Sequence, residues 1–298
     1  MIKYWIEAFR LRTLPLAIAC IGMGSFLAAS QNEFRWEVFL LSALTTIFLQ
    51  VLSNLANDYG DSKHGADSAE REGPTRAVQS GKITSKAMKN AMFIFAILSF
   101  ISGLSLIWVS FDQENLIIIL IFLILGILAI GAAITYTAGP SPYGYAGLGD
   151  ISVMVFFGWL GVLGTFYLHT SAWNWINLLP ATSCGLFATA VLNVNNIRDI
   201  PSDKIAGKMS IPVRIGREKA RIYHWLLLGF GLVLSTIYVF LNFQSGWQLL
   251  FLLALPLLLK NGKAVSKYEK SSDLDPYLKQ MALTTLVFVV TFGIGQII

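Results

Sequence analysis

One stretch of the sequence, from Asn54 to Asp67, has the residue types of a metal site. Its carboxylates, Asp58, Asp61 and Asp67, follow twenty residues, 38–57, that carry no charge. Residues three or four apart share a face of a helix, so Asn54, Asp58 and Asp61 are expected to line one side of a helix end. Carboxylate and amide oxygens are hard ligands of the kind that suit Mg²⁺.

A second stretch, from Asn195 to Asp203, closes another uncharged run. Asn195 and Asp199 repeat the spacing of Asn54 and Asp58, and Asp203 follows one turn later. Solvated loop charges would explain one such stretch, but matched spacing at two helix ends favours a site. Two acidic faces directed at one cavity repel each other unless cations lie between them, and Mg²⁺ commonly shares its ligands with substrate phosphates. The two stretches together predict a phosphorylated substrate bound through Mg²⁺.

Basic residues near both stretches could neutralise the remaining phosphate charge. They are Lys63, Arg71, Arg76, Lys204 and Lys208. Arg76 and Lys63 are the preferred pair. Any one of the five could instead set the orientation of the chain in the membrane or contact lipid headgroups.

A glycine- and proline-rich segment, 138–149, has tyrosines and an acid around it. Tyr136, Tyr143, Tyr145 and Asp150 could face the same cavity as the two acidic stretches. The tyrosines could also belong to an interfacial aromatic belt. Asp150 is the only charge in a long uncharged region, and it is either functional or a helix-terminal acid stabilised by the helix dipole.

The composition is that of a polytopic membrane protein. Of the 298 residues, 55% are hydrophobic and 13% are charged, about half of the ~25% usual for soluble domains. The net charge of +5 comes from residues in short loops, which indicates membrane orientation rather than nucleic-acid binding. Cys20 and Cys184 lie within apolar runs and are expected to be buried thiols, not a disulfide or metal ligands.

Uncharged runs predict an all-α fold with nine transmembrane helices. The runs are 13–32, 38–57, 90–111, 115–149, 151–197, 225–259 and 280–298. The fourth is expected to be a helix as far as Tyr136, followed by the glycine- and proline-rich loop. The fifth and sixth are too long for one helix, and each is expected to divide at polar, turn-forming residues, near 169–174 and 242–246.

The charge distribution predicts the orientation. With nine helices, every lysine and arginine except Arg35 falls on one side, which the positive-inside rule makes cytoplasmic. Both acidic stretches are then on the cytoplasmic side of the cell membrane. They end helices that run in the same direction, which suggests one domain, 1–298, built from parallel four-helix repeats at about 1–145 and 146–260 with a final helix at 280–298.

The chain resembles the intramembrane, UbiA-type, prenyltransferases at these residues. That family carries two aspartate-rich motifs at cytoplasmic helix ends, and Asn54–Asp61 and Asp199–Asp203 match them. Further likeness at 73–76, 135–150 and 195–199 is closest to the branch that prenylates 1,4-dihydroxy-2-naphthoate in menaquinone synthesis. In the first motif the second acid follows Asp58 by three residues instead of the family's four, so that Asp61 and Asp67 both remain candidates for the second ligand.

The resemblance implies a Mg²⁺-dependent transfer of a polyprenyl group from its diphosphate to the naphthoate, with loss of CO₂, giving demethylmenaquinone and diphosphate. The implied metal ligands are Asp58, Asp61, Asp67, Asp199 and Asp203. The implied substrate-binding residues are Asn54, Lys63, Arg76, Tyr143 and Asn195. The implied catalytic residues are Asp58, Asp199, Tyr136 and Asp150. Tyr136 would offer its ring to the allylic cation, and Asp150 would orient the acceptor hydroxyl.

Three alternatives stay open from the residues alone. The acceptor could be another aromatic compound. A cation-coupled transporter also has parallel repeats and intramembrane acids, although its sites usually lie near the bilayer midplane. A CDP-alcohol phosphotransferase also uses Mg²⁺ and aspartates, but it packs them in one motif.

Overall fold

The computed structural model describes residues 1–64, 76–111 and 115–298, and within them it is built from helices without any strand. In this described part, nine helical segments are long and apolar enough to cross a membrane. The spans are Ile2–Ala29, Trp36–His64, Ser85–Ser110, Leu116–Thr135, Gly149–Thr170, Trp175–Arg198, Arg217–Leu241, Gly246–Lys267 and Ser271–Ile297. The prediction of a nine-helix, multi-pass membrane protein is confirmed.

The helices fall into a first and a second half along the chain. The first half contains α1 (Ile2–Phe9), α2 (Leu14–Ala29), α3 (Trp36–His64), α4 (Ser85–Ser110) and α5 (Leu116–Thr135). The second half contains α6 (Gly149–Val153), the π-helix η2 (Met154–Gly164), α7 (Thr165–Thr170), α8 (Leu178–Arg198), α9 (Ile200–Ile205), α10 (Ile211–Ile215), α11 (Arg217–Leu241), α12 (Leu255–Lys267) and α13 (Asp275–Ile297). Short 3₁₀ turns connect some of them: η1 (Leu11–Thr13), η3 (Trp175–Asn177), η4 (Gly246–Ala254) and η5 (Ser271–Leu274).

Two helix ends decide where the acids lie. The uncharged run 38–57 ends before α3 does, since α3 continues to His64 and carries the first acids on its last turns. At the second stretch α8 ends at Arg198 and α9 begins at Ile200, with Pro201 in its first turn. Proline lacks the N–H that a continuing helix needs, which explains the break.

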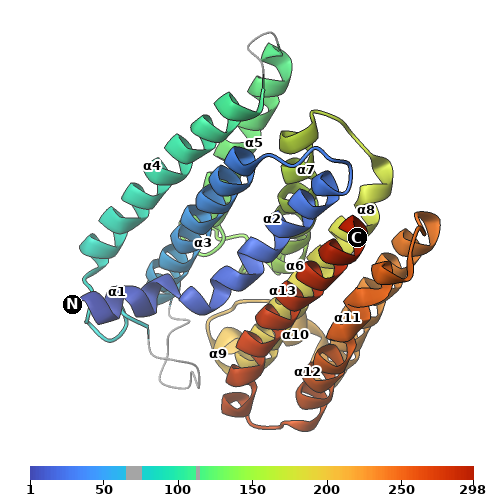
Figure 1. Ribbon diagram of the computed structural model, residues 1–298. Helices are drawn as coiled ribbons and strands as arrows, with labels where there is room; N and C mark the ends of the chain where they lie inside the picture. The colour runs from blue at the N-terminus through green and yellow to red at the C-terminus, as the bar shows by residue number, and fades with distance from the viewer. Residues whose placement is uncertain (65–75, 112–114) are drawn as a thin grey trace.

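The helices pack as two groups that meet along α2. Figure 1 shows α3, α4 and α5 on one side of the molecule and α8, α11, α12 and α13 on the other. The largest core cluster joins α2 to the second group, one smaller cluster lies within the first half of the chain and its following loop, and the other joins α3 and α4 to Leu168 of α7. Helix α5 packs mainly on α3 and α4 and buries none of its residues. The arrangement as two parallel repeats stays a prediction.

Candidate active site

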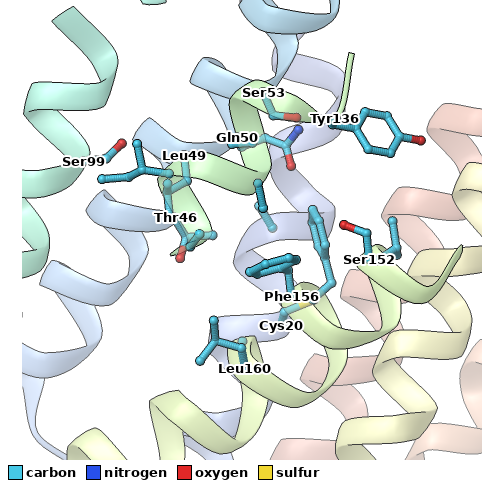
Figure 2. A pocket seen from close by; sticks show the side chains of 18 of the residues that line it. Cys20, Thr46, Leu49, Gln50, Ser53, Ser99, Tyr136, Ser152, Phe156 and Leu160 are labelled. Atoms are coloured by element: carbon cyan, nitrogen blue, oxygen red, sulfur yellow. The ribbon is translucent and has the colours of Figure 1, made fainter. Parts of the chain in front are cut away.

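A cavity of about 380 Å³ lies between the two groups of helices. Residues of α2, α3, α5, η2 and α8 line it. Figure 2 shows Thr46 and Gln50 of α3 facing Phe156 and Leu160 of η2 across the space. Its polar end lies at the C-terminal ends of α3 and α8, where the lining residues are Asn54, Asn57, Asp61, Arg76, Asn195, Asn196 and Lys208.

The acids of the first stretch are held by different partners. Asp58 is buried and accepts hydrogen bonds from the backbone N–H groups of Ala77 (3.0 Å) and Val78 (3.1 Å). Asp61 lines the cavity, accepts a hydrogen bond from the Tyr145 hydroxyl (2.7 Å) and forms an ion pair with Arg76. The chain that follows α3 therefore folds back onto it through these two carboxylates. Asp67, the other predicted ligand, lies outside the described residues.

The acid of the second stretch is paired with the arginine before it. Arg198 Nε and Nη2 donate to the two carboxylate oxygens of Asp199, at 2.8 and 2.9 Å. The same guanidinium donates to Asn195 Oδ1 (2.8 Å) and to Asp275 Oδ1 (2.6 Å). Asp275 also pairs with Arg12 of η1 at 3.0 Å. A chain of alternating charges thus joins the end of α8 to α13 and to the N-terminal segment.

Asp203 and Lys208 form a buried pair with excess negative charge around it. Lys208 Nζ lies 3.3 Å from Asp203 Oδ1, while Asp203 Oδ2 has no hydrogen-bond partner among the described residues. The pKa of Asp203 is raised to about 6, chiefly by burial and to a smaller extent by the charges of Asp199 and Asp61, against the opposing effect of Lys208. Burial disfavours the charge of Lys208, but attraction to Asp203 and Asp61 outweighs it and raises the pKa of the ammonium.

These residues suit a divalent cation once they exchange partners. In the described part of the chain no three acidic, histidine or cysteine side chains converge on one point. The charges of Asp199 and Asp61 nevertheless both act against the charge of Asp203, and one buried oxygen of Asp203 makes no hydrogen bond within the described residues. Each of these acids is paired with a cation, so Mg²⁺, which takes hard oxygen ligands, would replace those cations on binding.

The glycine-rich loop after α5 ties the two halves together at this end. The loop contributes Tyr145 to Asp61, and the Tyr145 carbonyl accepts a hydrogen bond from the Met209 N–H (2.9 Å). Gly147 has a φ of +78°, and a Cβ there would lie 2.4 Å from the Met209 carbonyl oxygen. Gly60 of α3 is equally constrained, because its Cβ would lie 2.2 Å from the carbonyl oxygen of Thr137. Both contacts require a residue without a side chain.

The predicted tyrosines and Asp150 divide between the cavity and the helix packing. Tyr136 and Tyr143 line the cavity, with their rings 5.4 Å apart. Burial raises the pKa of Tyr136 to about 12, although Lys208 lowers it. Asp150 does not line the cavity; its carboxylate accepts a hydrogen bond from the Tyr223 hydroxyl of α11 at 2.7 Å.

Two predicted substrate-binding residues of α3 have other surroundings. Asn54 lines the cavity but donates from its amide to the Phe9 carbonyl (2.9 Å) and to Thr13 Oγ1 (3.1 Å), which fastens the N-terminal segment to α3. Lys63 is exposed and does not line the cavity. Because α3 continues to His64, a residue two positions after Asp61 lies about 200° around the helix from it.

Sequence reasoning gave too little weight to Lys208 and passed over Asn196, Asp275 and Arg198. Lys208 follows the end of α9, where helical spacing no longer applies, so its place in the cavity comes from the fold alone. Nothing in the sequence marks Asp275 as part of the site except that it is an acid at the start of a helix. Arg198 directly follows the uncharged run 151–197 and precedes Asp199, and this adjacency is the one signal that the sequence carries for their pairing.

Comparisons with known proteins agree with this geometry. A profile of the UbiA prenyltransferase family matches residues 16–290. The 1,4-dihydroxy-2-naphthoate octaprenyltransferase of Haemophilus influenzae is 47% identical over 299 aligned positions, covering 100% of this chain and 96% of that protein. Its namesake from Mycobacterium tuberculosis is 34% identical over 95% of this chain and 93% of its own length. A UbiA homologue from Archaeoglobus fulgidus, solved bound to GPP and Mg²⁺, superposes with a TM-score of 0.66 at 16% identity, covering 99% of both chains.

Proposed function

From the fact that the chain belongs to the UbiA prenyltransferase family, we propose that it transfers a polyprenyl group from polyprenyl diphosphate to 1,4-dihydroxy-2-naphthoate. The proposal takes its acceptor from the names of relatives that align over almost the whole chain. It takes its donor from the charges at the polar end of the cavity. The enzyme acts in the cell membrane with this end facing the cytoplasm, as the distribution of lysine and arginine indicates.

One observation carries the proposal. The ion pair of Asp61 with Arg76 lines the polar end of one largely apolar cavity, and so does Lys208, whose ammonium pairs with the buried carboxylate of Asp203 behind it. A prenyl diphosphate has the matching form, because its charged head needs metal and cationic partners while its tail needs apolar walls.

The ion pairs suggest how the site receives its substrate. Asp61, Asp199 and Asp203 would hold Mg²⁺, which supplies positive charge to the phosphate oxygens. Asp61 and Asp203 would then release Arg76 and Lys208, which become free to bind the diphosphate. Both side chains line the cavity, so they stabilise the charge that develops on the diphosphate as the allylic C–O bond breaks. The exchange keeps every buried charge paired before and after binding.

The acceptor reacts by substitution at one ring carbon, where the prenyl group replaces the carboxylate. The electron-rich carbon that bears the carboxylate forms a bond to the allylic carbon, and the carboxylate then leaves as CO₂. Its electron pair restores the aromatic ring. The immediate product is the prenylated dihydroxynaphthalene, the reduced form of demethylmenaquinone. The Tyr136 and Phe156 rings, which line the cavity, shield the allylic cation from water and offer it their π-faces.

An assay of the purified protein tests the proposal. The protein is supplied with Mg²⁺, a polyprenyl diphosphate and 1,4-dihydroxy-2-naphthoate, and the release of diphosphate and CO₂ is followed. Equal amounts of both products are expected, and omission of Mg²⁺ should stop both. Diphosphate without CO₂ would assign a different acceptor. Absence of both products would contradict the proposal and favour a transporter.

A further inference from the structure

A buried amide without a partner lies in the cavity wall. Asn196 of α8 is only 2% exposed, its Oδ1 is fully buried without a hydrogen-bond partner, and its Nδ2 donates no hydrogen bond within the described residues. Its neighbour Asn193, one turn earlier, donates to the Ala220 carbonyl at 3.1 Å. A buried amide that makes no hydrogen bond is costly. Because Asn196 lines the cavity, a ligand in the cavity is the partner within its reach.

The hydroxyl of Tyr136 is a second unused group in the same wall. A Cβ on Gly149 would lie 2.8 Å from this hydroxyl and 3.2 Å from Leu192 Cδ2, which places the hydroxyl beside Gly149 and Leu192. Among the described residues it makes no hydrogen bond. The raised pKa keeps the hydroxyl protonated, so it can donate to an anionic oxygen.

Asn196 and Leu192, the residue beside the Tyr136 hydroxyl, both line the cavity on the membrane side of Asp199. Along α8, Asn196 precedes Asp199 by about one turn and Leu192 by about two, or roughly 5 and 10 Å toward the membrane interior. The reacting carbon of a prenyl diphosphate also lies on the membrane side of its phosphates. The ring that attacks it must therefore be held at about this depth.

We propose that the Asn196 amide and the Tyr136 hydroxyl form the subsite that binds the carboxylate of a hydroxyaryl carboxylate acceptor. The inference rests on the proposed function and adds the residues that select the acceptor. Two neutral hydrogen-bond donors suit a carboxylate that must later leave as CO₂, because they orient it without the full ion pair that would hold it in the ground state. The cationic groups of the site, Arg76 and Lys208, remain available for the diphosphate.

Kinetics with each substrate varied in turn test the subsite. Asn196→Leu and Tyr136→Phe should each raise the KM for 1,4-dihydroxy-2-naphthoate by about tenfold to a hundredfold, the range for losing a hydrogen bond to a charged oxygen. The KM for the polyprenyl diphosphate should change by less than about twofold. Asn193→Ala is the control on the same helix, and its acceptor KM should match that of the wild type. A rise in the diphosphate KM equal to that for the acceptor would overturn the assignment and place these groups on the donor.

Thermal unfolding separates binding from folding and from catalysis. Asn196→Leu should be no less stable than the wild type, because it removes an amide that makes no protein hydrogen bond, and a large loss of stability would overturn the inference. In the absence of donor, 1,4-dihydroxy-2-naphthoate should raise the unfolding temperature of the wild type and of Asn193→Ala but not that of Asn196→Leu. A rise of equal size in all three would also overturn it. This shift is measured without turnover, so it stands apart from the transfer assay that tests the proposed function.

Discussion

Replacing Gly60 by alanine should damage the active site through a single methyl group. The added Cβ would lie 2.2 Å from the carbonyl oxygen of Thr137, and the two backbones must separate by about 0.8 Å to reach 3.0 Å, the shortest such contact found in proteins. The hydrogen bond from Thr137 Oγ1 to Asn57 Oδ1, now 2.8 Å, would lengthen to about 3.6 Å and be lost. The same displacement pulls Asp61, the next residue, away from Tyr145.

The energy of this change can be bounded. Overpacking costs about 1–3 kcal/mol, and the lost hydrogen bond adds about 1 kcal/mol. The better helix propensity of alanine returns about 1 kcal/mol. We expect a net destabilisation of about 1–3 kcal/mol. We also expect a fall in kcat of about tenfold to a hundredfold, since a displacement near 1 Å is enough to disturb a catalytic arrangement.

A matched glycine on α5 provides the control. A Cβ on Gly131 meets nothing within 4 Å, and Gly131 does not line the cavity, so Gly131→Ala should keep both stability and activity. Unfolding temperature in detergent and diphosphate release would be measured for both variants. If Gly60→Ala proves as stable and as active as Gly131→Ala, the close approach of α3 to the loop does not position the acids, and the reasoning fails.

Three other substitutions address the charges of the site. Asp199→Asn should abolish Mg²⁺-dependent diphosphate release while the protein still inserts and purifies as a folded species; full activity would contradict its role as a metal ligand. Lys208→Met should raise the KM for the polyprenyl diphosphate by at least about tenfold, whereas exposed Lys204→Met should not, and equal values for the two would remove Lys208 from the diphosphate site. Asp275→Asn should lower stability by about 1–2 kcal/mol because its two arginine partners lose their shared acid; thermal unfolding compared with exposed Asp273→Asn measures this, and no difference between them would show that the charge chain is unimportant.

The nine spans could be predicted because the bilayer requires each one to be a long uncharged helix. The breaks in the long runs were visible for a similar reason, since polar and turn-forming residues stood at 169–174 and 242–246. The end of α3 was less visible. Its last turns are polar and resemble a loop in composition, yet Asp58 and Asp61 there are buried under the returning chain. That contact depends on residues that come later in the sequence.

The spacing of the acids is local and could be read from the sequence, but their partners could not. Asp61 is held by Arg76 and Tyr145, and the hydroxyl of Tyr145 comes from a loop 84 positions away. No pattern within one helix can reveal such a contact. Lys63 was preferred over Lys208 because it lies close to the acids in sequence, whereas distance in the folded chain decides which cation reaches the cavity.

Because protein buries no residue of α5, the surrounding lipid contacts this helix and forms part of the wall around the cavity. This helix of 20 residues is about 30 Å long, close to the thickness of a typical hydrocarbon core. A helix longer or shorter than the local bilayer adjusts its tilt at small cost, and α5 has little protein around it to resist. Its inner side lines the cavity, so we expect a change in the tilt of α5, and with it in the thickness of the surrounding membrane, to alter the width of the cavity.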